Sequence, residues 1–233
     1  MYKTIRFLDD TVDRILALAF IFVLLIGVYF IYDTAYVFYH ASAGRVSYYR
    51  PGAEAVEEET RPFTKDYVAW ITVYDTNIDY PIMQAENNSK YLNMDPFGDY
   101  SLAGSIFLDS RNAGDFTDSY SLVYGHHMSS GIMFGALDEY YKTAYFEKHR
   151  DGVLLVGDKQ YRAKAFAVLQ TDAGVDAIFD PSGSETVLEI AKNESLIYRT
   201  PVNEHILALS TCKEPGSTAR TVVLFTLTEE EEE

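Results

Sequence analysis

The sequence has only one cysteine, Cys212, and few basic residues. A single cysteine excludes an intrachain disulfide, and the absence of an HExxH motif and of paired cysteines leads us to predict no metal site and no cofactor. Nineteen lysines and arginines stand against 35 acidic residues, so the formal net charge is −16. We therefore expect no nucleic-acid partner, because a phosphate backbone requires a basic face.

An uncharged apolar run at residues 15–32 is the clearest feature of the N-terminal region. A helix of these 18 residues would be about 27 Å long, close to the thickness of a bilayer core. Lys3, Arg6 and Arg14 precede the run, and this positive charge predicts a cytoplasmic N-terminus. A cleaved signal peptide is the alternative, since "ASA" at residues 41–43 resembles a cleavage site, but the apolar run is long for a signal peptide.

These features predict a single-pass membrane protein with one folded domain outside the cytoplasm. The hydrophobic content of 48% is sufficient for a core. We expect a cytoplasmic segment at residues 1–14, a transmembrane anchor at 15–32, an extracellular linker or helical lead-in at 33–66, the folded domain at 67–228 and a disordered acidic tail at 229–233.

Short apolar runs separated by turn residues predict a mainly β fold. Residues 68–84 hold two such runs around "DTN", and residues 153–170 resemble a hairpin that turns at "GD". Further strands are expected at 104–109, at 120–127 and in the two final runs, "HILALSTC" and "RTVVLFTL". Regular short strands of this kind favour a β-barrel or a sandwich.

Two helices are expected between the strands. In "SGSETVLEIAK", Ser182 and Glu185 have the spacing of a capping box. In "MFGALDEYYK", four residues recur at helical spacing and predict one apolar face: Met133, Ala136, Leu137 and Tyr140.

The last two predicted strands bring Cys212 into register with Arg220. Seven residues, "KEPGSTA", separate the pair, and the turn residues Pro215 and Gly216 lie among them. If the loop is symmetric, Cys212 and Arg220 are opposed and share one face. A guanidinium beside a thiol favours the thiolate and can stabilise an oxyanion. The alternatives are a buried, inert cysteine and an arginine that serves only solubility.

A nucleophilic cysteine also needs a group that transfers protons, and His126 and His127 are the candidates. His205 lies about 23 Å along its strand from Cys212, and the remaining two histidines lie beside the apolar segment and after a predicted helix. Neighbouring residues of a strand point to opposite faces, so only one of His126 and His127 can serve a given site. Periodicity does not choose between them.

The order and spacing of several motifs resemble the sortase family, and most closely its class B members. The motifs are "WITVYDTNIDYPIMQ", "NSKYLN", "GSIFLDSRN", "YGHHMSSGIMFGAL" and "ALSTC", and the resemblance spans roughly residues 70–227. It implies a closed β-barrel with added helices over residues 67–228. It also implies a catalytic site in which Cys212 is the nucleophile, Arg220 the arginine and His126, directly after "YG", the histidine. The resemblance thus selects His126 over His127.

Four further residues match positions that line the class B substrate groove: Asn88, Leu92, Tyr124 and Ser210. Leu92 and Tyr124 could instead belong to the core, and Asn88 could be a turn residue. Lys213 follows the cysteine where class B members often carry an acidic residue.

The resemblance implies a cysteine transpeptidase outside the cell membrane. Its partners would be the sorting-signal peptides of secreted proteins and the amine of a lipid-linked peptidoglycan precursor. The alternatives are a secreted cysteine hydrolase on the same fold, a sortase that polymerises pilins, and a membrane-tethered binding module without catalysis.

Overall fold

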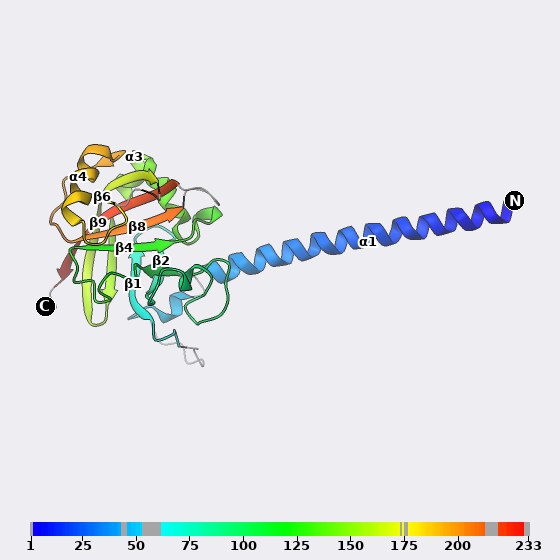
Figure 1. Ribbon diagram of the computed structural model, residues 1–233, viewed down its shortest axis with the longest axis horizontal. Helices are drawn as coiled ribbons and strands as arrows, with labels where there is room; N and C mark the ends of the chain where they lie inside the picture. Colours follow the sequence, from blue (N-terminus) through cyan, green and yellow to red (C-terminus); the bar gives the residue numbers. More distant parts are fainter. Residues whose placement is uncertain are drawn as a thin grey trace. The chain divides into compact units, whose positions relative to one another are not determined.

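The apolar N-terminal segment forms one long helix, α1 (Tyr2–Ala41), in the computed structural model (Figure 1). The structure describes residues 2–42, 46–52, 62–172, 174, 177–212 and 219–230, except for the side chains of residues 2–10 and of Cys212. The chain divides into two units, Met1–Tyr39 and His40–Glu233. The helix includes the predicted anchor and continues through the first part of the predicted linker. Its part Thr11–Ala41 is long and apolar enough to cross a membrane, a test that a signal sequence would also pass.

The second unit is a closed β-barrel, as predicted. Among the described residues, eight strands follow one another in the order β5-β1-β2-β3-β4-β8-β9-β6, and β6 pairs back with β5 to close the ring. A short strand, β7, pairs with β6 outside this ring. The strands are β1 (Tyr67–Val73), β2 (Asp79–Met83), β3 (Ile106–Leu108), β4 (Tyr120–Gly125), β5 (Asp151–Val156), β6 (Lys159–Asp172), β7 (Ile197–Tyr198), β8 (Ile206–Cys212) and β9 (Ala219–Glu230).

Alternation along the strands divides their side chains between the barrel interior and its outer face. The interior cluster draws buried residues from every strand of the ring, among them Ile71, Ile82, Ile106, Val123, Leu154, Ala163, Leu209 and Val223. On the outer face, Leu122 of β4, Ala208 of β8 and Leu224 of β9 pack with Val187 and Ala191 of helix α4 (Ser184–Glu194). β4, β8 and β9 are therefore buried on both faces where α4 covers them, which explains why "ILAL" and "VVLF" are apolar without interruption.

Both predicted helices exist, but their details differ from the predictions. "FGALDEYY" forms a 3-10 helix, η4 (Phe134–Tyr141), rather than an α-helix, and the expected apolar face is buried. Helix α4 begins one residue before Glu185 and lacks the expected capping box: its N-cap is Gly183, and the Ser182 hydroxyl donates to Asp180 instead. The other short helices are η1 (Ser47–Tyr49), η2 (Lys90–Leu92), η3 (Ser129–Gly131) and α3 (Thr143–Lys148).

The ends of the folded domain extend beyond the predicted barrel. Tyr49 and Phe63, from the predicted linker, pack their rings against each other and against Phe97. At the other end, β9 includes the first two residues of the acidic tail, and Glu229 and Glu230 form ion pairs with residues of β6. The prediction of disorder is therefore wrong for these two glutamates, because pairing with β6 orders them. The rest of the tail, 231–233, and the acidic part of the linker, 53–61, lie outside the described residues.

Candidate active site

The candidate site continues the outer-face row of side chains beyond the part that α4 covers. In β4, Tyr124 follows Leu122 on this face, in β8 Ser210 follows Ala208, and in β9 Arg220 precedes Val222. Tyr124 is the register partner of Ser210, and Ser210 in turn is that of Val222. The three strands lie next to one another in the ring (Figure 1), so their ends form one surface.

The backbone of Cys212 lies between Arg220 on one side and the end of β4 on the other. Cys212 pairs directly with Arg220 in the antiparallel β8–β9 ladder, so the register predicted from the loop length is confirmed. β4 and β8 run parallel, and their ladder ends with Gly125 beside Thr211; His126 and Cys212 are the next residues along the two segments. Lys213 and the turn residues Pro215 and Gly216 lie outside the described residues.

The structure separates the two adjacent histidines. His126 is half-buried, and its Nε2 donates a hydrogen bond of 2.8 Å to the carbonyl of Leu92, which fixes the ring. His127 bridges to Met133 and directs its Nε2 to the Asp138 carboxylate at 2.9 Å. His126 thus belongs to the surface that carries Tyr124 and Ser210, whereas His127 belongs to another cavity.

Gly104 permits the close packing that holds the Leu92 carbonyl in position. Its φ is +59°, in the left-handed region, and a Cβ at this position would lie 2.4 Å from the Tyr91 carbonyl oxygen and 2.6 Å from that of Leu92. Any side chain here would displace the backbone to which His126 is bonded.

A groove of about 330 Å³ joins the predicted residues. Of the seven residues predicted for the site, six line this groove. The seventh, Cys212, follows Ser210 and Thr211 in β8. Leu92 is 39% exposed, so it is not a core residue. The groove is lined by Asn88, Leu92, Phe107, Tyr124, Gly125, His126, Phe179, Ser210, Thr211 and Arg220.

The Ser210 hydroxyl is the most unusual polar group of the groove. Ser210 is 1% exposed, and none of the described residues gives its buried hydroxyl a hydrogen-bond partner. A buried polar group without a partner is costly, about 1–3 kcal/mol. A ligand in the groove could relieve this cost.

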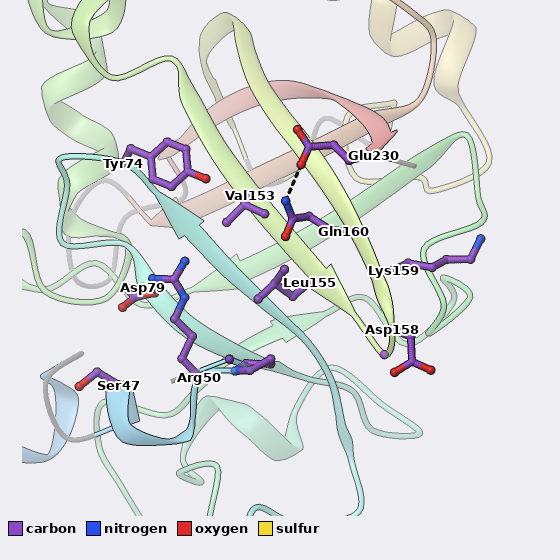
Figure 2. Close-up of a pocket in the computed structure, with 13 residues that line it drawn as sticks. Ser47, Arg50, Tyr74, Asp79, Val153, Leu155, Asp158, Lys159, Gln160 and Glu230 are labelled. Atoms are coloured by element: carbon purple, nitrogen blue, oxygen red, sulfur yellow. Dashed lines mark hydrogen bonds and ion pairs between the residues drawn. The ribbon is translucent and has the colours of Figure 1, made fainter. Parts of the chain in front are cut away.

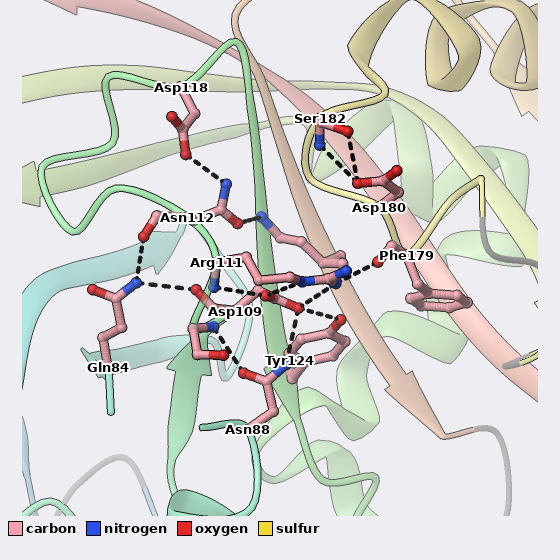
Figure 3. A network of polar contacts seen from close by, with 12 residues as sticks. Gln84, Asn88, Asp109, Arg111, Asn112, Asp118, Tyr124, Phe179, Asp180 and Ser182 are labelled. Carbon is pink, nitrogen blue, oxygen red and sulfur yellow. Dashed lines mark hydrogen bonds and ion pairs between the residues drawn. The ribbon is translucent and has the colours of Figure 1, made fainter. Parts of the chain in front are cut away.

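An ion pair that the sequence did not reveal is hydrogen-bonded to two lining residues of the groove, Asn88 and Tyr124 (Figure 3). Asp109, which follows β3, is fully buried, and Arg111 contacts both of its carboxylate oxygens at 2.9 Å. The same carboxylate accepts hydrogen bonds from the Tyr124 hydroxyl at 3.0 Å and from Asn88 Nδ2 at 2.9 Å. The signal in the sequence was the charged "D-S-R" directly after the apolar "IFL".

Burial and hydrogen bonding oppose each other at Asp109. Burial alone would raise the pKa of its carboxyl, but the hydrogen bonds from Arg111, Tyr124 and Asn88 outweigh this effect, and the pKa lies below its ordinary value. Burial, together with the Asp109 charge, raises the pKa of the Tyr124 hydroxyl, so Tyr124 stays protonated and donates. Hydrogen bonding to Asp109 likewise raises the pKa of Arg111.

A larger cavity lies on another part of the barrel (Figure 2). It has a volume of about 750 Å³, and Arg50, Tyr74, Asp79 and Glu230 are among the residues around it. None of its described lining residues is a cysteine or a histidine, so it does not provide thiol chemistry. Within the described residues, no cluster of three or more His, Cys, Asp or Glu side chains could hold a metal ion.

Comparison of the sequence with known proteins identifies two curated relatives. No family model matches the chain. Sortase B of Listeria monocytogenes is 33% identical over 162 residues, which cover 66% of this chain and 65% of that protein. Sortase B of Staphylococcus aureus is 31% identical over 186 residues, which cover 75% of this chain and 74% of that protein.

Solved structures of class B sortases resemble this chain. A Streptococcus pyogenes class B sortase involved in pilus biogenesis is 38% identical, with a TM-score of 0.66 over 71% of this chain and 94% of that one. A Staphylococcus aureus sortase B–substrate complex is 29% identical, with a TM-score of 0.65 over 72% of this chain and 82% of that one.

We expect Asp109→Asn to lower stability near neutral pH and to weaken its acid dependence. The neutral amide loses the ion pair with Arg111, and we expect a loss of about 1–3 kcal/mol in the free energy of unfolding at about pH 7. Because the folded pKa is lowered, the carboxylate's contribution is complete above the ordinary value of 3.8 and is lost as the pH falls through the folded pKa. Urea denaturation across this range should show the difference from wild type shrinking in acid. Asp158→Asn, at the exposed β5–β6 turn, is the matched control, and an Asp109→Asn deficit that stays constant with pH would contradict the assignment.

Proposed function

This chain belongs to the sortase family, closest to class B, and we propose that it cleaves the sorting signals of secreted proteins and joins the product to a cell-wall amine at the membrane surface. Sortases are cysteine transpeptidases that anchor or polymerise surface proteins, so the kind of enzyme follows from the family. The observation that carries the proposal is the register of Cys212, which has Arg220 opposite it in β9, with His126 directly after the end of the neighbouring strand β4.

The proposed reaction begins with acylation. The Cys212 thiolate attacks the carbonyl carbon of a threonine in the sorting signal, and the Arg220 guanidinium stabilises the oxyanion that forms. As the C–N bond breaks, His126 donates a proton to the departing amine, and a thioester remains on Cys212. Because His126 Nε2 donates to the Leu92 carbonyl, Nδ1 is the nitrogen left for this transfer.

The second half of the reaction returns the enzyme to its starting state. An incoming amine attacks the thioester, His126 takes its proton, and the C–S bond breaks to release the Cys212 thiolate and a new amide. The groove supports binding of an extended peptide, because it combines apolar walls with polar groups. We propose that Asn88, Leu92, Tyr124 and Ser210 contact the peptide, with the unpartnered Ser210 hydroxyl as a hydrogen-bonding position.

The apolar helix α1 supports tethering to a membrane. We propose a single-pass anchor that keeps the barrel outside the cytoplasm, because Lys3, Arg6 and Arg14 precede the apolar run. An enzyme held there would share one surface with lipid-linked wall precursors. This proximity would raise the effective concentration of the acceptor.

Pilin polymerisation is the second candidate function. It is favoured by the likeness to the Streptococcus pyogenes class B sortase involved in pilus biogenesis, at 38% identity. The two functions share the acylation half-reaction and differ only in the amine that receives the acyl group.

We expect Cys212→Ala and His126→Ala to lower kcat for cleavage of the sorting peptide by about 10³-fold or more, since each removes a reacting group. His127→Ala should keep most activity, because its ring is turned to Asp138. Arg220→Lys should lose about 10²-fold, because a point charge does not reproduce the planar guanidinium fork. Peptide-cleavage kinetics of folded variants measure all four, and an active His126→Ala beside an inactive His127→Ala would reverse the assignment.

We expect the soluble fragment that begins near residue 47 to cleave its sorting peptide slowly in water and to form an amide when an amine is added. Water is present at about 55 M, and only an amine oriented by the site can compete with it, which effective molarities of about 10⁵–10⁸ M allow. Mass spectrometry should find amide and free acid in a ratio that follows amine concentration. Free acid alone, at saturating levels of several wall-derived amines and of a pilin lysine peptide, would leave the hydrolase as the function.

We expect protease added to intact protoplasts to remove the barrel and to spare the extreme N-terminus, because the proposed anchor leaves the barrel outside. Immunoblotting with an epitope at each end of the chain reads the result. Lysed protoplasts are the control, in which both epitopes should be lost. A protected barrel would reverse the orientation, and a barrel released into the medium without its N-terminus would identify a cleaved signal sequence.

A further inference from the structure

The Asp109–Arg111 ion pair takes no part in the proposed chemistry, yet its carboxylate is a fully buried charge next to the groove. The Asp109 side chain is fully buried, while that of Arg111 is 55% exposed. A buried ion pair commonly contributes little more stability than well-packed apolar residues would. The hydrogen bonds of the pair instead constrain the positions of the residues that they connect.

The pair connects three separate parts of the groove. Through its carboxylate it binds the Tyr124 hydroxyl of β4 and the Asn88 amide of the β2–β3 connection. Through its guanidinium it binds the carbonyl of Phe179, in the connection before α4, at 2.6 Å (Figure 3). None of these hydrogen bonds runs to His126 or Arg220.

The two aromatic walls are positioned by opposite halves of the pair. The rings of Tyr124 and Phe179 stack with centroids 6.5 Å apart and an interplanar angle of 19°. The Tyr124 hydroxyl is bonded to Asp109 and the Phe179 backbone to Arg111, so the spacing of the rings depends on the intact pair. Phe107 packs on Tyr124 at 5.4 Å and extends the apolar surface.

The same pair orients the Asn88 amide. The Ser110 backbone N–H is a donor and binds Asn88 Oδ1 at 2.8 Å, while the Asp109 carboxylate is an acceptor and binds Nδ2. These two hydrogen bonds determine the positions of Oδ1 and Nδ2 in the amide. The second N–H of Nδ2 can donate to another acceptor.

We propose that Asp109 and Arg111 are positioning residues that set the width of the apolar part of the groove and the direction of the Asn88 amide, and thereby determine which peptides bind. The proposal rests on the proposed function for its peptide substrate. It predicts an effect on peptide binding and selectivity rather than on the reactivity of Cys212, since the pair holds the walls of the groove and not the reacting groups.

A thiol-alkylation assay tests the geometry without a peptide substrate, because Cys212 is the only thiol in the chain. Iodoacetamide and N-benzyl iodoacetamide react identically: the thiolate forms an S–C bond, the C–I bond breaks and iodide leaves. Only the benzyl reagent has an apolar group that the groove can hold. The ratio of the two rates therefore reports the apolar part of the groove.

We expect Arg111→Gln to lower this ratio about tenfold, with the iodoacetamide rate unchanged, because a small displacement of a wall strongly affects fit. Arg111→Lys, which keeps the charge but not the fork, should be intermediate. Tyr124→Phe should also lower the ratio. In the Tyr124→Phe background, Arg111→Gln should lower the ratio less than it does in wild type, because both changes break the same network. Arg162→Gln, which removes an exposed arginine paired with Glu230, is the matched control and should match wild type.

Peptide kinetics give the second readout. In Arg111→Gln we expect KM for the sorting peptide to rise about tenfold while kcat changes little, the signature of lost binding rather than lost chemistry. Equal reagent ratios and equal KM in wild type and folded Arg111→Gln would overturn the proposal, as would a uniform fall in both alkylation rates. Should Arg111→Gln fail to fold, Arg111→Lys and Tyr124→Phe carry the same test. If wild type forms no amide product, the proposed function fails, while the reagent ratio still decides on the positioning pair.

Discussion

Strand β8 pairs with β4 on one side and with β9 on the other, and the candidate site depends on this position. The parallel β4–β8 register sets Tyr124 beside Ser210, and the antiparallel β8–β9 register sets Arg220 opposite Cys212. Side chains on one face of three paired strands have little freedom to move apart. The backbone hydrogen bonds of the barrel thus determine distances that a site built on loops would have to maintain by other means.

The outer face of the same strands explains where the groove lies. Apolar side chains on β4, β8 and β9 are covered by α4, and beyond this cover the residues of the row become polar or amphipathic. Asp109 lies next to the groove, where its buried carboxylate accepts hydrogen bonds from Arg111, Tyr124 and Asn88. The outer-face side chains under α4 therefore lead directly into the groove. The Asp109–Arg111 pair borders the groove.

The short apolar runs predicted two hairpins and either a barrel or a sandwich, and only the family resemblance selected the closed barrel. Loop length predicted the Cys212–Arg220 register. It did not choose between His126 and His127 by periodicity, since alternation separates the two faces but does not say which one α4 leaves open. The Asp109 network was missed because its partners, Asn88, Tyr124 and Phe179, are far apart in the chain. The expected capping box is absent at Ser182 for a local reason, because the Ser182 hydroxyl donates a hydrogen bond to Asp180.

The strand order also has a consequence for the timing of biosynthesis. The groove takes Phe107 and Tyr124 from the middle of the chain and Ser210 and Arg220 from near the end of the described residues, and β8 is needed before β4 gains its second neighbour. While the chain emerges from the ribosome, the part that carries His126 is made before Cys212 and Arg220 exist. Such long-range pairing forms late and slowly. A nascent chain therefore cannot assemble the groove until nearly all of its barrel has been made.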